Sequence, residues 1–381
     1  MNTKNNTKNS TKKIFFACII FTLVLSACSK PKSGTASPAA DTNGFAIKYA
    51  KLFSIDYMDG NIKLVTDQSG KKLLLVPYGQ NVPSGFNEAL VVRTPVKNAF
   101  YMYTTDVGFL DSLNSPDLLE SVAAVSTPQN DWTIQKILDG FKSGRITYIP
   151  DNIVNVEPVI KINPDIIFAG TINMGAGDIL GQFKATGLPY TVTADWMEES
   201  NFAFLEWIKF FAAFYNKDKE AAIIFEEKVK HINGLQDLTA TIPPDQYPMV
   251  AYASVFNGIV YTQGGDSPTA LEYKKAACTY YLANLHEKGQ IRIGMEEFID
   301  KAHDADILLY ASLVNYTPDK QSFLETSPLL AELKAFKNDR VYVLSRSYYM
   351  DSARSDEKFN DLIAICHPEL FPDRELSFYV K

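Results

Sequence analysis

Short apolar runs alternate with amphipathic stretches along much of the chain. Apolar runs that end at turn residues are typical of buried strands, whereas apolar residues that recur three or four positions apart indicate helices. In the first half the pattern predicts strands at residues 89–92, 99–102, 122–125, 166–169 and 187–192, and helices at 107–113 and 134–141. This alternation favours a parallel, doubly wound α/β sheet.

Two helical stretches follow, at residues 201–216 and 218–238. Aromatic residues recur near helical spacing in the first of them, which favours core packing over a cofactor site. Pro243 and Pro244 end the region. We therefore expect a rigid helical connector over residues 201–240.

The second half repeats the pattern of the first. Ser267 and Pro268 have the residue types preferred at a helix cap and in a first helical turn. Strands are predicted at residues 249–253, 259–262, 307–310 and 341–344, and helices at 267–277 and 355–366. The predicted lobes are residues 44–200 and 241–381.

A carboxylate stands about ten residues before a buried strand in each half. Glu157 begins a short helical turn beside a proline, and Glu296 begins the corresponding turn in the second half, with Glu297 next to it. Acidic side chains suit the positive end of a helix dipole, so each can be a solvated helix-start acid. Their paired placement supports two similar lobes.

Residues 44–77 read as short strands at a sheet edge. The candidates are residues 45–47, 51–55 and 72–76, separated by glycine-containing turns. Their role stays open.

The N-terminus has the pattern of a secretory signal. Lysines precede an apolar run at residues 14–25, which is too short for a permanent membrane helix. The run leads to Cys28, which is similar to the acylated cysteine of a bacterial lipobox; the alternative is an ordinary signal with a chance cysteine. Residues 1–28 are the predicted signal, and residues 29–43 are a polar tether.

Composition excludes some partners. The net charge is -7 and the pI about 5.3, which argues against nucleic acid and against a basic membrane-binding surface, so the lipid would be the membrane anchor. About 350 residues remain after the signal, enough for two domains. An extracytoplasmic setting permits a disulfide between Cys278 and Cys366, but two well-separated cysteines leave the question open.

Several segments together resemble one family. Residues 156–157 with 163–167, residues 295–298 with 304–306, and residues 361–370 match, in order and spacing, the substrate-binding lipoproteins of ABC importers for iron-siderophores, haem and cobalamin. The resemblance covers residues 89–371, and residues 44–77 have no clear counterpart.

The resemblance implies two Rossmann-like lobes joined by a backbone helix, with the ligand in a cleft between them. It also implies a permease and its ATPase as partners and a monomeric binding protein. In the family one glutamate per lobe docks onto permease arginines, and these positions correspond to Glu157 and Glu296. Exposed carboxylates on two rigid lobes suit charge-assisted pairing.

The ligand should lie beyond the carboxyl ends of the strands. Aromatic faces with hydroxyl groups suit a flat or macrocyclic ligand such as haem, a corrinoid or a catecholate complex, and Arg346 and Arg354 suit its anionic groups. Core packing is the alternative for each aromatic residue. The candidates are Tyr103, Thr104, Thr105, Ser126, Thr127, Trp132, Thr171, Asn173, Trp196, Phe256, Tyr261, Gln263, Arg346, Tyr348 and Tyr349.

Other classes fit less well. The four histidines are scattered without chelating spacing, so we expect no protein-bound metal and no resident cofactor. An anchored hydrolase would need a nucleophile motif, and none is found; the glycine cluster at residues 175–177 is incomplete. An adhesive lipoprotein would show repeats. The remaining alternative is a different small solute on the same scaffold.

Overall fold

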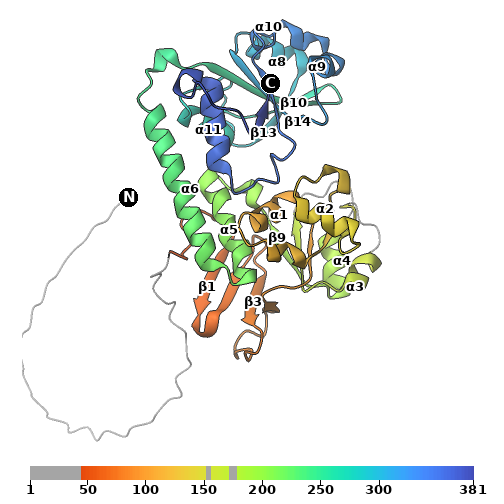
Figure 1. The fold of residues 1–381 in the computed structure, drawn as a ribbon. Coiled ribbons are helices and arrows are strands. Elements are labelled where there is room, and N and C mark those ends of the chain that lie inside the picture. Colours follow the sequence, from red (N-terminus) through yellow and green to blue (C-terminus); the bar gives the residue numbers. More distant parts are fainter. Residues whose placement is uncertain (1–43, 152–155, 171–177) are drawn as a thin grey trace, which may run out of the picture. The chain divides into compact units, whose positions relative to one another are not determined.

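The computed structural model describes residues 44–151, 156–170 and 178–381 (Figure 1). The predicted signal with Cys28, the tether, Thr171 and Asn173 lie outside the described residues. Within the described ranges the strands form sheets of four, five and seven strands. The fold is α/β with parallel strands in each sheet, as the sequence predicts.

The four-stranded sheet opens the described chain. Its order is β1-β2-β3-β4, antiparallel except for the parallel pair β3–β4. The sequence pattern missed β2, and β4 joins this sheet instead of the doubly wound one. The strands are β1 (Ser54–Met58), β2 (Ile62–Thr66), β3 (Lys72–Pro77) and β4 (Leu90–Thr94).

The strand predicted at residues 45–47 is wrong, and the strand predicted at 51–55 begins only at residue 54. The N–H groups of residues 48–50 donate to the buried carboxylate of Glu206 at 2.7–3.0 Å. Those of the next two residues donate to Glu198 at 3.1 Å. Because carboxylates take the N–H groups of residues 48–52, these residues cannot donate to a strand ladder, so β1 begins only at residue 54.

The five-stranded sheet is entirely parallel, in the order β7-β6-β5-β8-β9. Numbered along the chain, this order is 3-2-1-4-5, that of a Rossmann sheet. The sequence pattern missed β7 and α4. The elements are β5 (Ala99–Tyr101), α1 (Thr104–Asp111), β6 (Val122–Val125), α2 (Gln135–Lys142), β7 (Thr147–Tyr148), α3 (Glu157–Ile162), β8 (Ile166–Gly170), α4 (Ile179–Thr186) and β9 (Tyr190–Thr193).

The two helices predicted as the connector are α5 (Asn201–Tyr215) and α6 (Asp218–Thr239), and they pack against each other. Ser200 caps α5 by accepting from the N–H of Ala203 at 3.2 Å. Asn216 ends α5 in the left-handed conformation. Trp207, Phe210, Phe211, Phe214 and Tyr215 of α5 are buried, and the half-buried Phe202 and Phe204 pack against the same core, so the predicted core role is confirmed.

The seven-stranded sheet is mixed, in the order β13-β11-β10-β14-β15-β16, with β12 also paired to β10. Strands β12, β10, β14 and β15 are parallel, whereas β11, β13 and β16 are antiparallel to their neighbours. The strands are β10 (Met249–Phe256), β11 (Ile259–Gln263), β12 (Thr279–Tyr280), β13 (Gln290–Gly294), β14 (Ile307–Leu313), β15 (Val341–Leu344) and β16 (Tyr379–Val380).

The helix cap predicted at Ser267 is confirmed. Ser267 accepts from the N–H of Ala270 at 3.2 Å and begins α7. The pattern missed β12, β13, β16, α9 and α10. Cys278 and Cys366 are buried free thiols whose sulfur atoms lie 2.7 Å apart. The helices are α7 (Pro268–Lys275), α8 (Met295–Ala302), α9 (Lys320–Thr326), α10 (Lys334–Lys337) and α11 (Ser355–Cys366).

One apolar cluster runs through all three sheets. It joins Leu73 and Leu75 of β3, Phe168 of β8, most of α5 and Leu309 of β14. Separate clusters fill the space under α3 and α4, and under α8 to α10. Among the described helices, none combines the length and apolarity needed to cross a bilayer.

Replacing Glu206 by Gln tests how the start of the chain is held. Glu206 also binds the buried ammonium of Lys209 at 2.9 Å, so the change leaves Lys209 without its counter-charge. We expect a loss of about 3–5 kcal/mol in the free energy of unfolding, measured by urea denaturation. Glu226→Gln, which breaks the half-exposed pair with Lys48, is the control and should lose less than about 1 kcal/mol. Equal losses in the two variants would contradict the conclusion that Glu206 holds the N-terminal segment.

Candidate ligand-binding site

The candidate site begins where the strand order of the five-stranded sheet reverses, at β5 and β8. Ligands of open α/β sheets bind beyond the carboxyl ends of such strands. Tyr103 follows β5, and its ring lies against Gly170 at the end of β8, since a Cβ on Gly170 would be 1.5 Å from Cε2 of Tyr103. Thr104 and Thr105 come next and begin α1, half-buried.

A loop of the second half, residues 345–354, contacts this edge. The Ser352 hydroxyl donates to the carbonyl of Thr105 at 2.9 Å. Gly108 of α1 lets the loop approach closely, because a Cβ there would be 2.0 Å from the carbonyl oxygen of Met350. This loop carries Tyr348 and Tyr349.

The same loop also contacts the segment after β6. The Thr133 hydroxyl donates to the sulfur of Met350 at 3.2 Å. The guanidinium of Arg346 donates to the carbonyl of Asn130. Arg354 instead binds Glu357 of its own helix. The structure thus brings Thr104, Thr105 and the 345–354 loop together from opposite halves of the sequence.

Several other predicted ligand residues are buried in the core or lie at or after the ends of other strands. Trp132 is 2% exposed, and its indole N–H donates to the carbonyl of Thr127 at 3.1 Å, so it packs in the core. Trp196, 52% exposed, follows β9. Phe256, 66% exposed, ends β10. The half-buried Ser126 follows β6.

Tyr261 and Gln263 lie on β11. The guanidinium of Arg292 on β13 lies 5.3 Å from the centre of the Tyr261 ring. The backbone of Gln263 exchanges hydrogen bonds with the hydroxyl of Tyr280. Both residues therefore take part in the antiparallel extension of the sheet.

Sequence reasoning missed two carboxylates buried beneath the switch point. Asp106 lies in the first turn of α1, and Asp195 follows β9. Burial raises the pKa of both, and that of Asp195 rises to about 7. The Thr193 hydroxyl donates to Asp106 at 3.0 Å. No motif marks these residues, because their burial depends on the packing of α1 over β9.

Sequence reasoning also missed two residues next to Tyr348, namely Tyr379 of β16 and Lys358 of α11. The hydroxyls of Tyr348 and Tyr379 lie 3.4 Å apart, and the ammonium of Lys358 on α11 lies 4.6 Å from the centre of the Tyr348 ring. Burial lowers the pKa of Lys358 to about 8. A search limited to strand ends overlooks side chains inside helices, such as Lys358.

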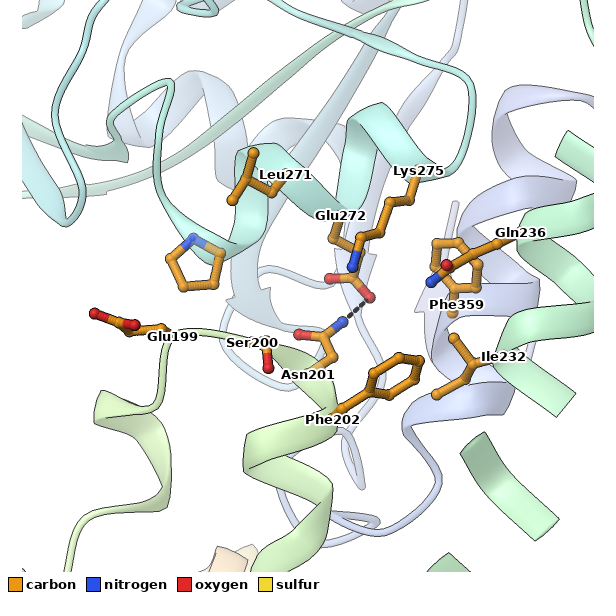
Figure 2. A pocket seen from close by; sticks show the side chains of 11 residues that line it. Glu199, Ser200, Asn201, Phe202, Ile232, Gln236, Leu271, Glu272, Lys275 and Phe359 are labelled. Carbon is orange, nitrogen blue, oxygen red and sulfur yellow. Dashed lines mark hydrogen bonds between the residues drawn. The ribbon is translucent and has the colours of Figure 1, made fainter. Parts of the chain in front are cut away.

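Glu272 of α7 faces a small pocket, and Asn201 at the start of α5 donates to its carboxylate at 2.5 Å (Figure 2). Burial raises the pKa of Glu272 to about 7. The pocket holds about 70 Å³, well below the roughly 300 Å³ at which ligand sites begin. It also involves Glu199, Ser200, Phe202, Ile232, Gln236, Pro268, Leu271, Lys275 and Phe359.

The histidines contact single acids or backbone carbonyls. His231 binds Asp356 at 2.7 Å, and the buried His367 faces backbone carbonyls at 3.1 Å. In the part of the chain that the structure describes, no three histidine, cysteine or acidic side chains gather as a metal site.

The paired glutamates lie at corresponding places. Glu157 is exposed at the start of α3, and Glu296 is exposed in the first turn of α8, followed by the exposed Glu297. Each helix leads to a parallel strand of its own sheet, β8 or β14.

The sequence profile of the periplasmic binding protein family matches residues 117–348. The chain belongs to this family. Its members bind small solutes and work with ABC transporters, and they are not enzymes.

The chain is also similar to other proteins over most of its length. An uncharacterized lipoprotein of Methanocaldococcus jannaschii is 29% identical over 96% of this chain and 94% of its own. The molybdate-bound periplasmic binding protein of Haemophilus influenzae is similar at a TM-score of 0.60 and 14% identity, covering 82% and 94% of the two chains. A periplasmic haem-binding protein of Pseudomonas aeruginosa follows at 0.56 and 15%, covering 72% and 93%. At such low sequence identity, the similarity to these two solved structures shows the fold alone.

Replacing Glu272 by Gln should change how the stability of this binding protein depends on pH. Because the folded-state pKa is about 7, against an ordinary value near 4.5, folding favours the protonated acid. Its contribution to stability is complete below about pH 4.5 and is lost as the pH rises to about 7, by at most roughly 3 kcal/mol.

We therefore expect Glu272→Gln to melt above the native protein at pH 8 and close to it at pH 5, as measured by calorimetry. Glu325→Gln, at an exposed position, should follow the native protein at both pH values. A difference that does not change with pH would contradict the prediction.

Proposed function

We propose that this protein is a lipid-anchored, extracytoplasmic binding protein that captures an iron-siderophore, haem or cobalamin and delivers it to the permease of an ABC importer. The observation that carries the proposal is the contact between the switch-point edge at Thr105 and the 345–354 loop. It places aromatic and hydroxyl side chains from both halves of the chain around one edge. The family match and the haem-binding neighbour support the ligand class.

A different small solute is the second candidate. The similar structure from Haemophilus influenzae holds molybdate, a small oxyanion, on the same fold. The small volume of the Glu272 pocket is also nearer to the size of such an ion than to that of a macrocycle.

The anchor is proposed to be Cys28. The signal pattern before it supports this assignment, as does the lipoprotein description of the Methanocaldococcus jannaschii relatives. The chain would then be tethered outside the cytoplasm through residues 29–43, as a monomer.

Glu157 and Glu296 are proposed to dock onto arginines of the permease. Their exposure and their matching places before β8 and β14 support this role. Glu297 competes with Glu296 for the second position.

A ligand panel tests the proposed function. The soluble protein, starting after Cys28, is mixed with ferric catecholate and hydroxamate siderophores, haem, cobalamin and molybdate. A bound ligand at a hundred times its Kd should stabilise the fold by about 2.7 kcal/mol, seen as a rise in Tm. A shift with molybdate alone supports the second candidate. No Tm shift and no fluorescence quenching with any of these probes would contradict both.

Charge reversal tests the docking role. The double variant Glu157→Arg, Glu296→Arg should reduce uptake at least tenfold, because like charges would then face the permease. Ligand affinity should stay at the native value. Glu227→Arg with Glu325→Arg, two exposed positions on α6 and α9, is the charge-matched control. A loss of affinity in the first variant would assign these residues to the ligand site instead.

A further inference from the structure

Lys358 is a charged residue without a counter-ion. It lies one turn into α11, half-buried, and it forms no ion pair with any described residue. The acids near it on its own helix are engaged elsewhere: Glu357 binds Arg354 at 2.5 Å, and Asp356 binds Lys228 at 3.0 Å. Asp361, which lies three residues further along the same face, binds Arg374 at 2.6 Å.

Acids on neighbouring segments do not replace the missing partner. Asp351 and Glu272 act on Lys358 from a distance and oppose the loss of its proton. However, Asp351 lies 3.5 Å from Arg354, and Glu272 accepts from Asn201. Each nearby carboxylate therefore has a closer partner than Lys358.

The surroundings of Lys358 disfavour its charge. Burial is the largest cause of its lowered pKa, and the nearby guanidinium of Arg354 adds repulsion. A position near the start of a helix is also unfavourable for a cation, because the helix dipole is positive there. An ammonium held in such a place costs stability unless something outside the chain compensates it.

Aromatic rings hold the ammonium in position. It lies 4.6 Å from the centre of the Tyr348 ring and 5.6 Å from that of Phe378. Cation–π contact orients the ammonium but supplies no negative charge. Tyr348 belongs to the 345–354 loop, so Lys358 lies beside the segment that contacts α1.

We propose that Lys358 binds an anionic group of the solute, a carboxylate, a phosphate or a metal oxyanion, with the hydroxyl of Tyr348 as a neighbouring donor. The inference rests on the proposed binding function and narrows it to ligands that carry negative charge. An anion beside Lys358 would supply the missing counter-charge and gain a charge-assisted hydrogen bond.

The first test needs no known ligand. Lys358 should react faster than ordinary lysines with an acylating reagent near pH 8, because more of it is neutral there. Sodium molybdate or inorganic phosphate should slow this reaction at least fivefold, measured by peptide mass spectrometry. Lys337, exposed at the end of α10, is the internal control and should react equally with and without the anion.

The second test compares matched probes. Haem is compared with its dimethyl ester, and an anionic ferric catecholate with a neutral ferric hydroxamate. In whichever probe pair binds, we expect the anionic compound to bind at least tenfold more tightly than its neutral counterpart. Lys358→Met should remove this preference, whereas Lys358→Arg and Lys337→Met should keep it. The preference should also weaken as the pH rises above 8.

The outcomes separate the two proposals. If both members of a pair bind equally and Lys358→Met changes nothing, the Lys358 inference is overturned while the binding function stands. If no probe binds but molybdate or phosphate protects Lys358, the anion site stands and the proposed macrocyclic ligands do not. If no probe binds and neither anion protects Lys358, both fail.

Discussion

The enclosure of α5 is the constraint on which the structure depends. A helix that is apolar around its circumference must be covered on all sides. Phe53 of the N-terminal segment packs on Trp207 and Phe210, and Phe168 of β8 packs on Phe211. Helix α6 covers a further side. Because these partners come from distant parts of the sequence, folding of the first half requires α5 in place.

Two buried polar residues fix the register of this packing. Glu206 accepts hydrogen bonds from the N–H groups of residues 48–50 and binds Lys209. Helix α5 therefore holds this N-terminal segment by charge as well as by apolar contact. Tyr215 at the other end shares hydrogen bonds with Tyr101 and Ser121, at 2.7 and 2.8 Å. Apolar packing tolerates small shifts, whereas these directional bonds do not.

The sequence predicts the elements whose signals are local. The strand at residues 122–125 and the cap at Ser267 follow from apolar runs and from side chains next to the backbone they bind. The strand predicted at 51–55 begins only at residue 54 because Glu206 and Glu198, some 150 residues away, take the N–H groups of residues 48–52. Short strands such as β7 and β16 depend on a neighbouring strand, so two residues carry no periodic signal.

The same division applies to the candidate site. The strand-end rule selects Tyr103, Thr105 and Tyr348 as candidates, because strand ends can be read along the chain. It cannot locate Glu272 of α7 or Lys358 of α11, because both lie inside helices and away from strand ends. Trp132 shows the opposite error: it follows a strand end, yet its ring turns into the core.

The bare α-carbon of Gly108 has a consequence for the reach of the 345–354 loop. The oxygen of Met350 occupies the space where even an alanine methyl would stand. A backbone carbonyl cannot rotate away as a flexible side chain can, so a methyl group at position 108 would push the loop away from α1. The contact between Met350 and α1 therefore requires a residue without a Cβ at position 108.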